Sequence, residues 1–124
     1  MAKLQPEPKT SELHLTAVLY ALSDETRLQI VQSLTWTSEI ACGYFDIDMP
    51  KSSLSHHFRV LRSAGVIATR KDGTALLNRL RREDLDEKFP GLLDSVLASM
   101  SRRKPNLRAK KSSRTPARKS TRVN

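Results

Sequence analysis

Residues 50 to 80 have the pattern of an amphipathic helix followed by two strands that a turn-forming pair joins. This order of elements limits the folds that the chain can adopt. The stretch begins with PKSSLSHHFRVLRSAG, in which Pro50 suits the first position of a helix and Gly65 suits its end. It continues with VIATR and TALLNRL, two runs typical of strands, and the KDG between them contains Asp72-Gly73, a strong hairpin signal. The sequence therefore predicts a helix followed at once by a β-hairpin.

The predicted helix has one apolar face and one polar face. Each helical residue turns by about 100°, which places on the buried side Leu54, Phe58 and Leu61. The opposite side carries Ser52, His56, Arg59 and Ser63. In the major groove of DNA, Arg reads guanine edges, while hydroxyl and imidazole groups contact bases or phosphates. The polar face is a candidate DNA-reading surface, although most polar helix faces are simply solvated.

Further helices are predicted on both sides of this unit. Apolar spacing predicts a short helix from about 13 to 22 and a second to about 34, with Ser23 as the N-cap of the second. Ser38 can cap a brief third helix over EIACGYF. After the hairpin we expect a short turn at 83–88 and a new helix that begins near Pro90, because Pro90-Gly91 cannot lie inside one helix.

Positive charge is concentrated in two parts of the chain. The net charge is +9, yet residues 102–124 alone hold ten Lys and Arg residues and no acid. Residues 50–82 hold eight basic residues and one acidic residue, between two acidic segments. Such a positive segment indicates a face for a polyanion such as DNA. The C-terminal segment either adds salt-dependent attraction to DNA or is a solvated end.

Length and composition limit the remaining possibilities. A chain of 124 residues fits one domain, which we place at 12–101, between a flexible arm at 1–11 and a disordered basic tail at 102–124. The single cysteine excludes an internal disulfide, and no signal peptide or long apolar run is present, so we expect a cytoplasmic protein without a membrane partner. The sequence contains neither a nucleophile paired with a base nor a phosphate-binding glycine loop, so we do not expect an enzyme.

Two segments, LSDETRLQIVQSL (22–34) and KSSLSHHFRVLRSAGVIATRKDGTALLNRL (51–80), resemble the ArsR/SmtB-like winged-helix transcriptional repressors. The resemblance covers roughly residues 13–100. It implies a mainly α fold with a small β-hairpin (α+β), a winged helix-turn-helix in the order α-α-α-α-β-β-α. It also implies a homodimer that represses transcription and reads a palindromic operator in double-stranded DNA with helix 50–64 and a wing near 70–75.

The predicted DNA contacts lie along this helix, at its start and at the hairpin tip. They are Lys51, Ser52, Ser53, Ser55, His56, Arg59, Arg62, Arg70, Lys71 and Thr74. Of these, Arg62 lies to the side of the helix and faces either phosphate or solvent.

Apolar residues of the first and last helices are left over after one small core is filled, and the resemblance favours dimerisation through these two helices. The predicted interface residues are Leu13, Val18, Leu19, Leu22, Leu92, Leu93, Val96, Leu97 and Met100. The alternative is that they complete the core of the monomer.

The stretch CGYFDIDMPKSSLSHHFRVL contains residue types that bind transition metals. His56 and His57 are adjacent and leave the helix about 100° apart, so they cannot chelate one ion; we expect His57 to be packed or hydrogen-bonded. The resemblance points the same way, because the metal positions of the family correspond here to Glu39, Ala41, Arg82, Asp84, Ser95 and Ala98. We expect no metal and no cofactor. The alternative is a poorly matched set of Cys42, Asp46, Asp48 and His14.

Cys42 is the remaining candidate for a regulatory site. An exposed thiolate could act as a redox switch, whereas a small, partly buried apolar residue is the plainer interpretation. Three functions therefore stay open: a sequence-specific regulator with an unknown effector, a metal- or redox-responsive sensor of the same fold, and a non-specific architectural DNA-binding protein.

Overall fold

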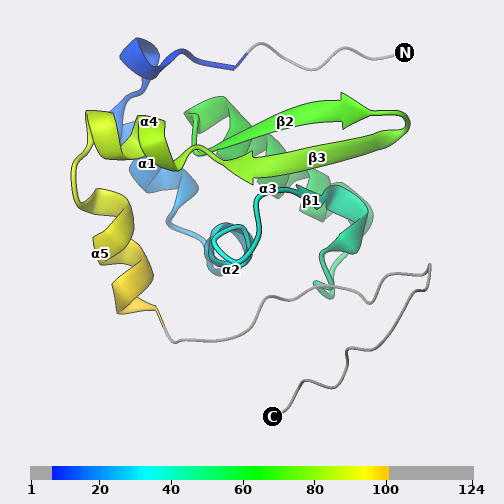
Figure 1. Cartoon of the computed structure of the whole chain (residues 1–124). Helices are drawn as coiled ribbons and strands as arrows, with labels where there is room; N and C mark the ends of the chain where they lie inside the picture. The colour runs from blue at the N-terminus through cyan, green and yellow to red at the C-terminus, as the bar shows by residue number, and fades with distance from the viewer. Residues whose placement is uncertain (1–6, 101–124) are drawn as a thin grey trace.

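The computed structural model describes residues 7–100 as five α-helices and a small sheet (Figure 1). The helices are α1 (Leu15–Ala21), α2 (Glu25–Ser33), α3 (Lys51–Ala64), α4 (Arg82–Lys88) and α5 (Leu92–Ser99). The strands are β1 (Ile40–Ala41), β2 (Ile67–Asp72) and β3 (Ala75–Leu80). Two short 3-10 helices, η1 (Thr10–Glu12) and η2 (Cys42–Tyr44), complete the elements. The predicted helix and hairpin at 50–80 are present as α3, β2 and β3.

The sheet is antiparallel, with the strand order β1-β3-β2. The hairpin turns at Gly73 and Thr74, one residue later than the sequence suggested, since Asp72 still pairs with Ala75. Gly73 has a φ of 66°, a conformation that glycine adopts without a steric penalty. The predicted hairpin is thus confirmed, and a third strand joins it.

The core lies between α2, α3 and the sheet. Ile30 and Val31 of α2, Leu61 of α3 and Ile67 of β2 are 0% exposed. Phe58 of α3 packs edge-to-face against another buried ring, that of Phe45, with ring centroids 5.2 Å apart. Burying side chains of this size contributes roughly 1.5–3 kcal/mol each. The apolar side of α3 is therefore fixed to the body of the domain.

The predicted third helix over residues 39–45 is wrong. Ile40 and Ala41 pair with Asn78 and Leu77 of β3, and only Cys42–Tyr44 form a helical turn, of the 3-10 type. The segment becomes a strand because the outer side of β3 offers unpaired backbone groups that must be satisfied.

Two further predictions of local structure need correction. Residues 82–88 form the helix α4, not a turn, because Leu85 enters the core and Glu83 and Asp84 occupy the first helical turn, where acids are favoured. The N-cap of α2 is Asp24 rather than Ser23, since the Asp24 carboxylate accepts a hydrogen bond of 3.0 Å from the Arg27 N–H. The helix near Pro90 begins at Leu92, after Gly91.

Residues 7–11, which we expected to be part of a loose arm, contact the body of the domain. A carboxylate oxygen of Glu7 accepts a hydrogen bond from the Thr69 N–H of β2, at 2.8 Å. The carbonyl of Pro8 accepts another from the Arg81 guanidinium, at 2.7 Å. Residues 1–6 of the expected arm and the basic tail at 102–124 lie outside the described residues.

Candidate nucleic-acid interface

The two faces of α3 are divided as the sequence predicted. Phe58 and Leu61 are 3% and 0% exposed, whereas Leu54, which was expected on the same buried side, is only half-buried. The exposed residues on the other side are Ser52, His56, Arg59 and Ser63. Lys51, Ser53 and Ser55 are exposed as well, whereas Arg62 is half-buried. The exposed face is confirmed, and its contact with DNA stays a prediction.

The first turn of α3 suits an anion. Pro50 is the N-cap and provides no side-chain hydrogen bond to the backbone N–H groups that follow. Those N–H groups belong to Lys51, Ser52 and Ser53, and the helix dipole adds positive partial charge at this end. A DNA phosphate placed there would meet N–H donors, hydroxyl groups and an ammonium group.

Arg27 of α2 holds α3 in place from behind. Its side chain is 5% exposed, and its Nη1 donates a hydrogen bond to Nδ1 of His57, at 3.1 Å. Nε donates to the carbonyl of Ala21 at 2.8 Å, and Nη2 donates to that of Tyr20 at 3.2 Å. The guanidinium thus joins the end of α1, α2 and α3, and it lies 5.1 Å from the Tyr20 ring.

His57 has the structural role that the sequence predicted. Burial lowers the pKa of its imidazole, although the Asp24 carboxylate, 3.7 Å away, acts in the opposite direction. A neutral ring accepts the hydrogen bond from Arg27 at Nδ1, and a protonated ring cannot. Sequence reasoning missed Arg27 itself. The signal that could have identified it is its position, because Arg27 is a charged residue among the inward-facing residues of α2.

At the hairpin, Arg70, Lys71 and Thr74 are exposed, as expected for a wing. Arg70 is also bound to Glu39 by two hydrogen bonds, of 2.8 Å from Nε and 2.9 Å from Nη2. This pairing lowers the pKa of the Glu39 carboxyl. Sequence reasoning did not anticipate this partner, which neutralises one of the predicted DNA contacts.

Asn78 connects the hairpin to β1 and η2. It is 0% exposed, and its Nδ2 donates to the carbonyl of Ile40 and to Sγ of Cys42, both at 3.1 Å. Its Oδ1 accepts a hydrogen bond of 2.8 Å from the Thr69 hydroxyl. Burial raises the pKa of the Cys42 thiol. The neutral thiol is the poorer nucleophile, which weighs against a redox switch at Cys42.

The predicted dimer residues fall into two groups. Four of them, namely Leu13, Val18, Leu22 and Leu93, are at most 7% exposed and fill the core of the monomer itself. They offer almost no surface to a partner, so their assignment to an interface needs correction. Leu19 is 44% exposed, and half-buried positions are held by Leu92, Val96, Leu97 and Met100. Sequence reasoning did not include two other exposed residues of α1 among the candidates for an interface, Leu15 at 47% and Tyr20 at 61% exposed.

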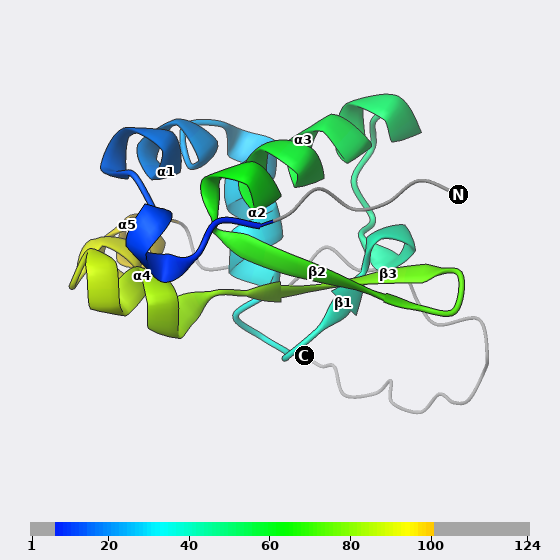
Figure 2. The same ribbon diagram turned by 90° about the horizontal axis from the view of Figure 1, so that it is seen from above.

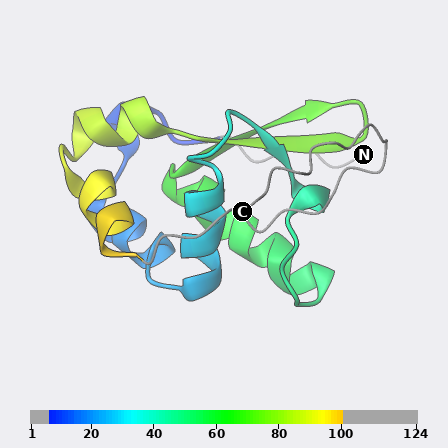
Figure 3. The same ribbon diagram turned by 60° about the horizontal axis from the view of Figure 1, so that its bottom comes forward.

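The predicted DNA contacts at the start of α3 and at the hairpin tip lie at the other end of the domain from α1 and α5, whereas Arg59 and Ser63, further along α3, line a shallow pocket together with Ala17 and Tyr20 of α1. Figures 2 and 3 show the start of α3 and the tip of the β2–β3 hairpin at one end, with α1, α4 and α5 at the other.

Known proteins show the same combination of sequence and fold. The pattern of the bacterial regulatory protein ArsR family matches residues 24–69. YceK of Bacillus subtilis (strain 168), an uncharacterized HTH-type transcriptional regulator, is 36% identical over 92 residues, which cover 71% of this chain and 92% of YceK. The arsenical resistance operon repressor of Staphylococcus xylosus is 35% identical over 75 residues, or 58% of this chain and 70% of the repressor.

The chain belongs to the ArsR family. A solved structure of a possible transcriptional regulator for arsenical resistance supports the same conclusion, with a TM-score of 0.54 and 31% identity over 66% of this chain and 84% of the solved one. The fold is the winged helix-turn-helix of ArsR-family regulators. This ArsR-family protein is therefore a DNA-binding transcriptional regulator and not an enzyme.

Two of the residues that the resemblance placed at metal-ligand positions, Glu39 and Arg82, form ion pairs in this chain. Glu39 is bound to Arg70, and Arg82 is bound to Asp94 at 2.9 Å. Within residues 7–100, no three His, Cys, Asp or Glu side chains gather closely enough to hold a metal ion. In the same range, no helix is long and apolar enough to cross a membrane.

Proposed function

We propose that this regulator acts as a homodimeric repressor that reads a palindromic operator with α3 in the major groove. The observation that carries the proposal is the exposed polar face of α3, opposite an apolar face on which Phe58 and Leu61 are buried in the core. Arg59 projects from the middle of that face and is the residue best suited to read a guanine edge. Ser52, His56 and Ser63 beside it supply hydroxyl and imidazole groups for neighbouring bases or phosphates.

The wing supplies the second part of the proposed contact. Lys71 and Thr74 lie at the exposed hairpin tip, at the same end of the domain as the start of α3 (Figure 2). They would contact the DNA backbone or the minor groove beside the recognition helix. Arg70 would join them after exchanging Glu39 for a phosphate.

A twofold dimer explains the surface at the other end of the domain. Helix α1, which carries the exposed Leu15 and Leu19, lies at the same end of the domain as α5, which carries the half-buried Val96 and Leu97 (Figure 3). Pairing these surfaces would remove apolar area from water and place two α3 helices about 34 Å apart, one turn of DNA. Such a repressor would block transcription by binding near promoters, in the cytoplasm.

The decisive experiment measures operator affinity at fixed salt concentration. Footprinting first identifies a discrete protected site, and fluorescence anisotropy then compares Arg59→Ala with the wild type. Loss of a guanine contact should weaken specific binding by about 1–3 kcal/mol. Lys88→Ala is the matched control, because it removes one exposed positive charge on α4, at the other end of the domain. Equal affinities for both variants would refute the role of α3.

A second function, a non-specific architectural protein, is favoured by one observation, the ten basic residues at 102–124. Uniform protection across a long DNA fragment, with no discrete site, would support it over the repressor.

A further inference from the structure

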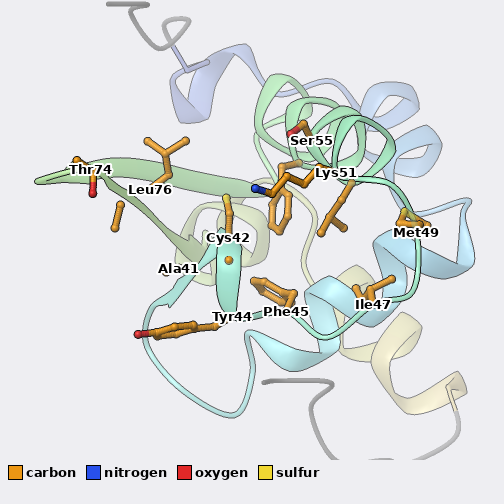
Figure 4. A pocket seen from close by; sticks show the side chains of 14 residues that line it. Ala41, Cys42, Tyr44, Phe45, Ile47, Met49, Lys51, Ser55, Thr74 and Leu76 are labelled. Carbon is orange, nitrogen blue, oxygen red and sulfur yellow. The ribbon is translucent and has the colours of Figure 1, made fainter. Parts of the chain in front are cut away.

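A pocket of about 720 Å³ separates the start of α3 from the hairpin. Its walls come from η2 and the loop after it, from the first two turns of α3, and from Thr74, Ala75 and Leu76 at the start of β3 (Figure 4). This volume lies within the range of roughly 300–1,000 Å³ that is usual for small-molecule sites. The pocket is therefore large enough to hold a small organic ligand.

The lining is mostly apolar, with a few polar groups at its margin. The apolar side chains include Phe45, Ile47, Leu54, Phe58 and Leu76. The hydroxyl groups come from Tyr44, Ser55 and Thr74, and the single charged side chain is that of Lys51. Figure 4 shows the Lys51 side chain extending from α3 towards the side of the pocket where Cys42 lies. An apolar body with one polar end would match this lining.

The charge of the site favours an anion. No Asp or Glu lines the pocket, and the Lys51 ammonium group forms no hydrogen bond or ion pair with any residue in the range 7–100. The N-terminus of α3, which lacks a side-chain cap, contributes positive partial charge at the same end.

We propose that this pocket between α3 and the wing binds a small amphipathic carboxylate, such as an aryl-alkanoic or medium-chain fatty acid. The hydrocarbon would lie against Phe45, Phe58 and Leu76, and the carboxylate would pair with Lys51. One charged contact and an apolar floor suit a monoanion better than a phosphate or a dicarboxylate, whose further charges would find no partner in this lining.

Binding of the carboxylate would weaken DNA binding, and this part of the inference rests on the proposed function. Lys51 and Ser55 of α3 and Thr74 of the wing line the pocket and are also predicted DNA contacts. An occupant neutralises Lys51 and fixes the wing at a set distance from α3. Because coupling between two binding sites is reciprocal, DNA would weaken carboxylate binding by the same factor.

The test titrates the full-length protein, without DNA, with 4-phenylbutyrate, 4-phenylbutanol and 4-phenylbutylamine. Methyl NMR signals of Ala41, Ala75 and Met49 report occupancy of the pocket. The carboxylate should bind about five- to tenfold more tightly than the alcohol and the amine. Lys51→Met should reduce its affinity to that of the alcohol. Lys71→Met, which removes the same charge from the hairpin outside the pocket lining, should leave it unchanged.

Each outcome bears on one part of the inference. Absence of methyl shifts at about 1 mM carboxylate, or equal affinity for all three compounds, overturns the site, whatever the protein does with DNA. Saturable carboxylate binding with unchanged operator affinity keeps the site and overturns the coupling. Carboxylate binding by a protein without a discrete operator supports the site and refutes the proposed function.

Discussion

The guanidinium of Arg27 donates a hydrogen bond to Nδ1 of His57, one residue away from the exposed His56. The contact joins α2 to α3 directly behind the proposed DNA-reading face. It requires a neutral imidazole, so this link between α2 and α3 depends on the protonation state of a half-buried side chain.

We expect the free energy of unfolding to decrease as the pH falls below about 6.5. The pKa of His57 is lowered from 6.5 in the folded protein, so the unfolded chain binds the proton more readily. The stabilisation is complete above the unfolded pKa and is lost as the pH falls towards the folded pKa. Urea unfolding from about pH 8 to about pH 5 measures this change.

The matched variants for this test are His57→Gln and His56→Gln. Glutamine at 57 keeps an acceptor for Arg27 and removes the titrating group, so the dependence on pH should diminish. The same change at the exposed His56 should preserve it. A full pH dependence in His57→Gln would contradict the assignment.

Gly65→Ala should destabilise the protein by about 2 kcal/mol or more. Gly65 ends α3 with a φ of 85°, and a Cβ at this position would collide with the Leu13 side chain. Gly43→Ala is the control, because a Cβ there would have no neighbour within 4 Å. Thermal unfolding of both variants checks the prediction, and equal melting temperatures would show that Gly65 is not required.

Glu39→Gln should raise affinity for DNA by about two- to fivefold at moderate salt. The change removes the negative charge and one of the two oxygens that accept hydrogen bonds from Arg70, so its guanidinium becomes more available to a phosphate. Anisotropy at several salt concentrations should also show a steeper salt dependence.

A double-mutant cycle separates this effect from the simple loss of a negative charge. In the Arg70→Ala background, Glu39→Gln should have little effect on DNA affinity. An increase of the same size in both backgrounds would mean that the ion pair does not restrain Arg70.

Leu19→Glu should yield a folded monomer. Leu19 is 44% exposed on α1, whereas the adjacent Val18 is 0% exposed. Val18→Ala should instead lower the melting temperature and leave the oligomeric state unchanged, because it removes core packing. Sedimentation velocity and thermal unfolding distinguish the two effects. A monomeric wild type at micromolar concentration would contradict dimerisation through α1 and α5.

Truncation after Ser101 should reduce non-specific DNA affinity and flatten its salt dependence, because ten basic residues are removed. The preference for the operator over unrelated DNA should remain. A competition assay measures both, and loss of the preference would assign a specific role to the tail.

Local sequence signals were sufficient for the central part of the fold. The 100° rotation per residue placed Phe58 inside and Arg59 outside, and Asp72-Gly73 marked the hairpin. Strand β1 could not be predicted in this way. Ile40 and Ala41 pair with residues of β3 about 37 positions later, and nothing in the local sequence encodes that pairing.

The functional residues that were missed depend on the same distant contacts. Glu39 reaches Arg70 because β1 joins the sheet, and Arg27 reaches His57 because α2 packs on α3. The sequence alone also could not predict which apolar residues are buried in the core and which are exposed. Val18 and Leu19 are neighbours of the same character, and only the packing of α1 decides which of them remains exposed.

The hydrogen bond from the Thr69 N–H to Glu7 occupies part of the exposed edge of the sheet. Strand β2 is the outer strand of the sheet, and an open strand edge is a template for unwanted pairing between molecules. Glu7 occupies a donor on that edge with a charged side chain from the same chain. The segment before α1 thus occupies one backbone donor that a strand of another molecule would need in order to pair with β2.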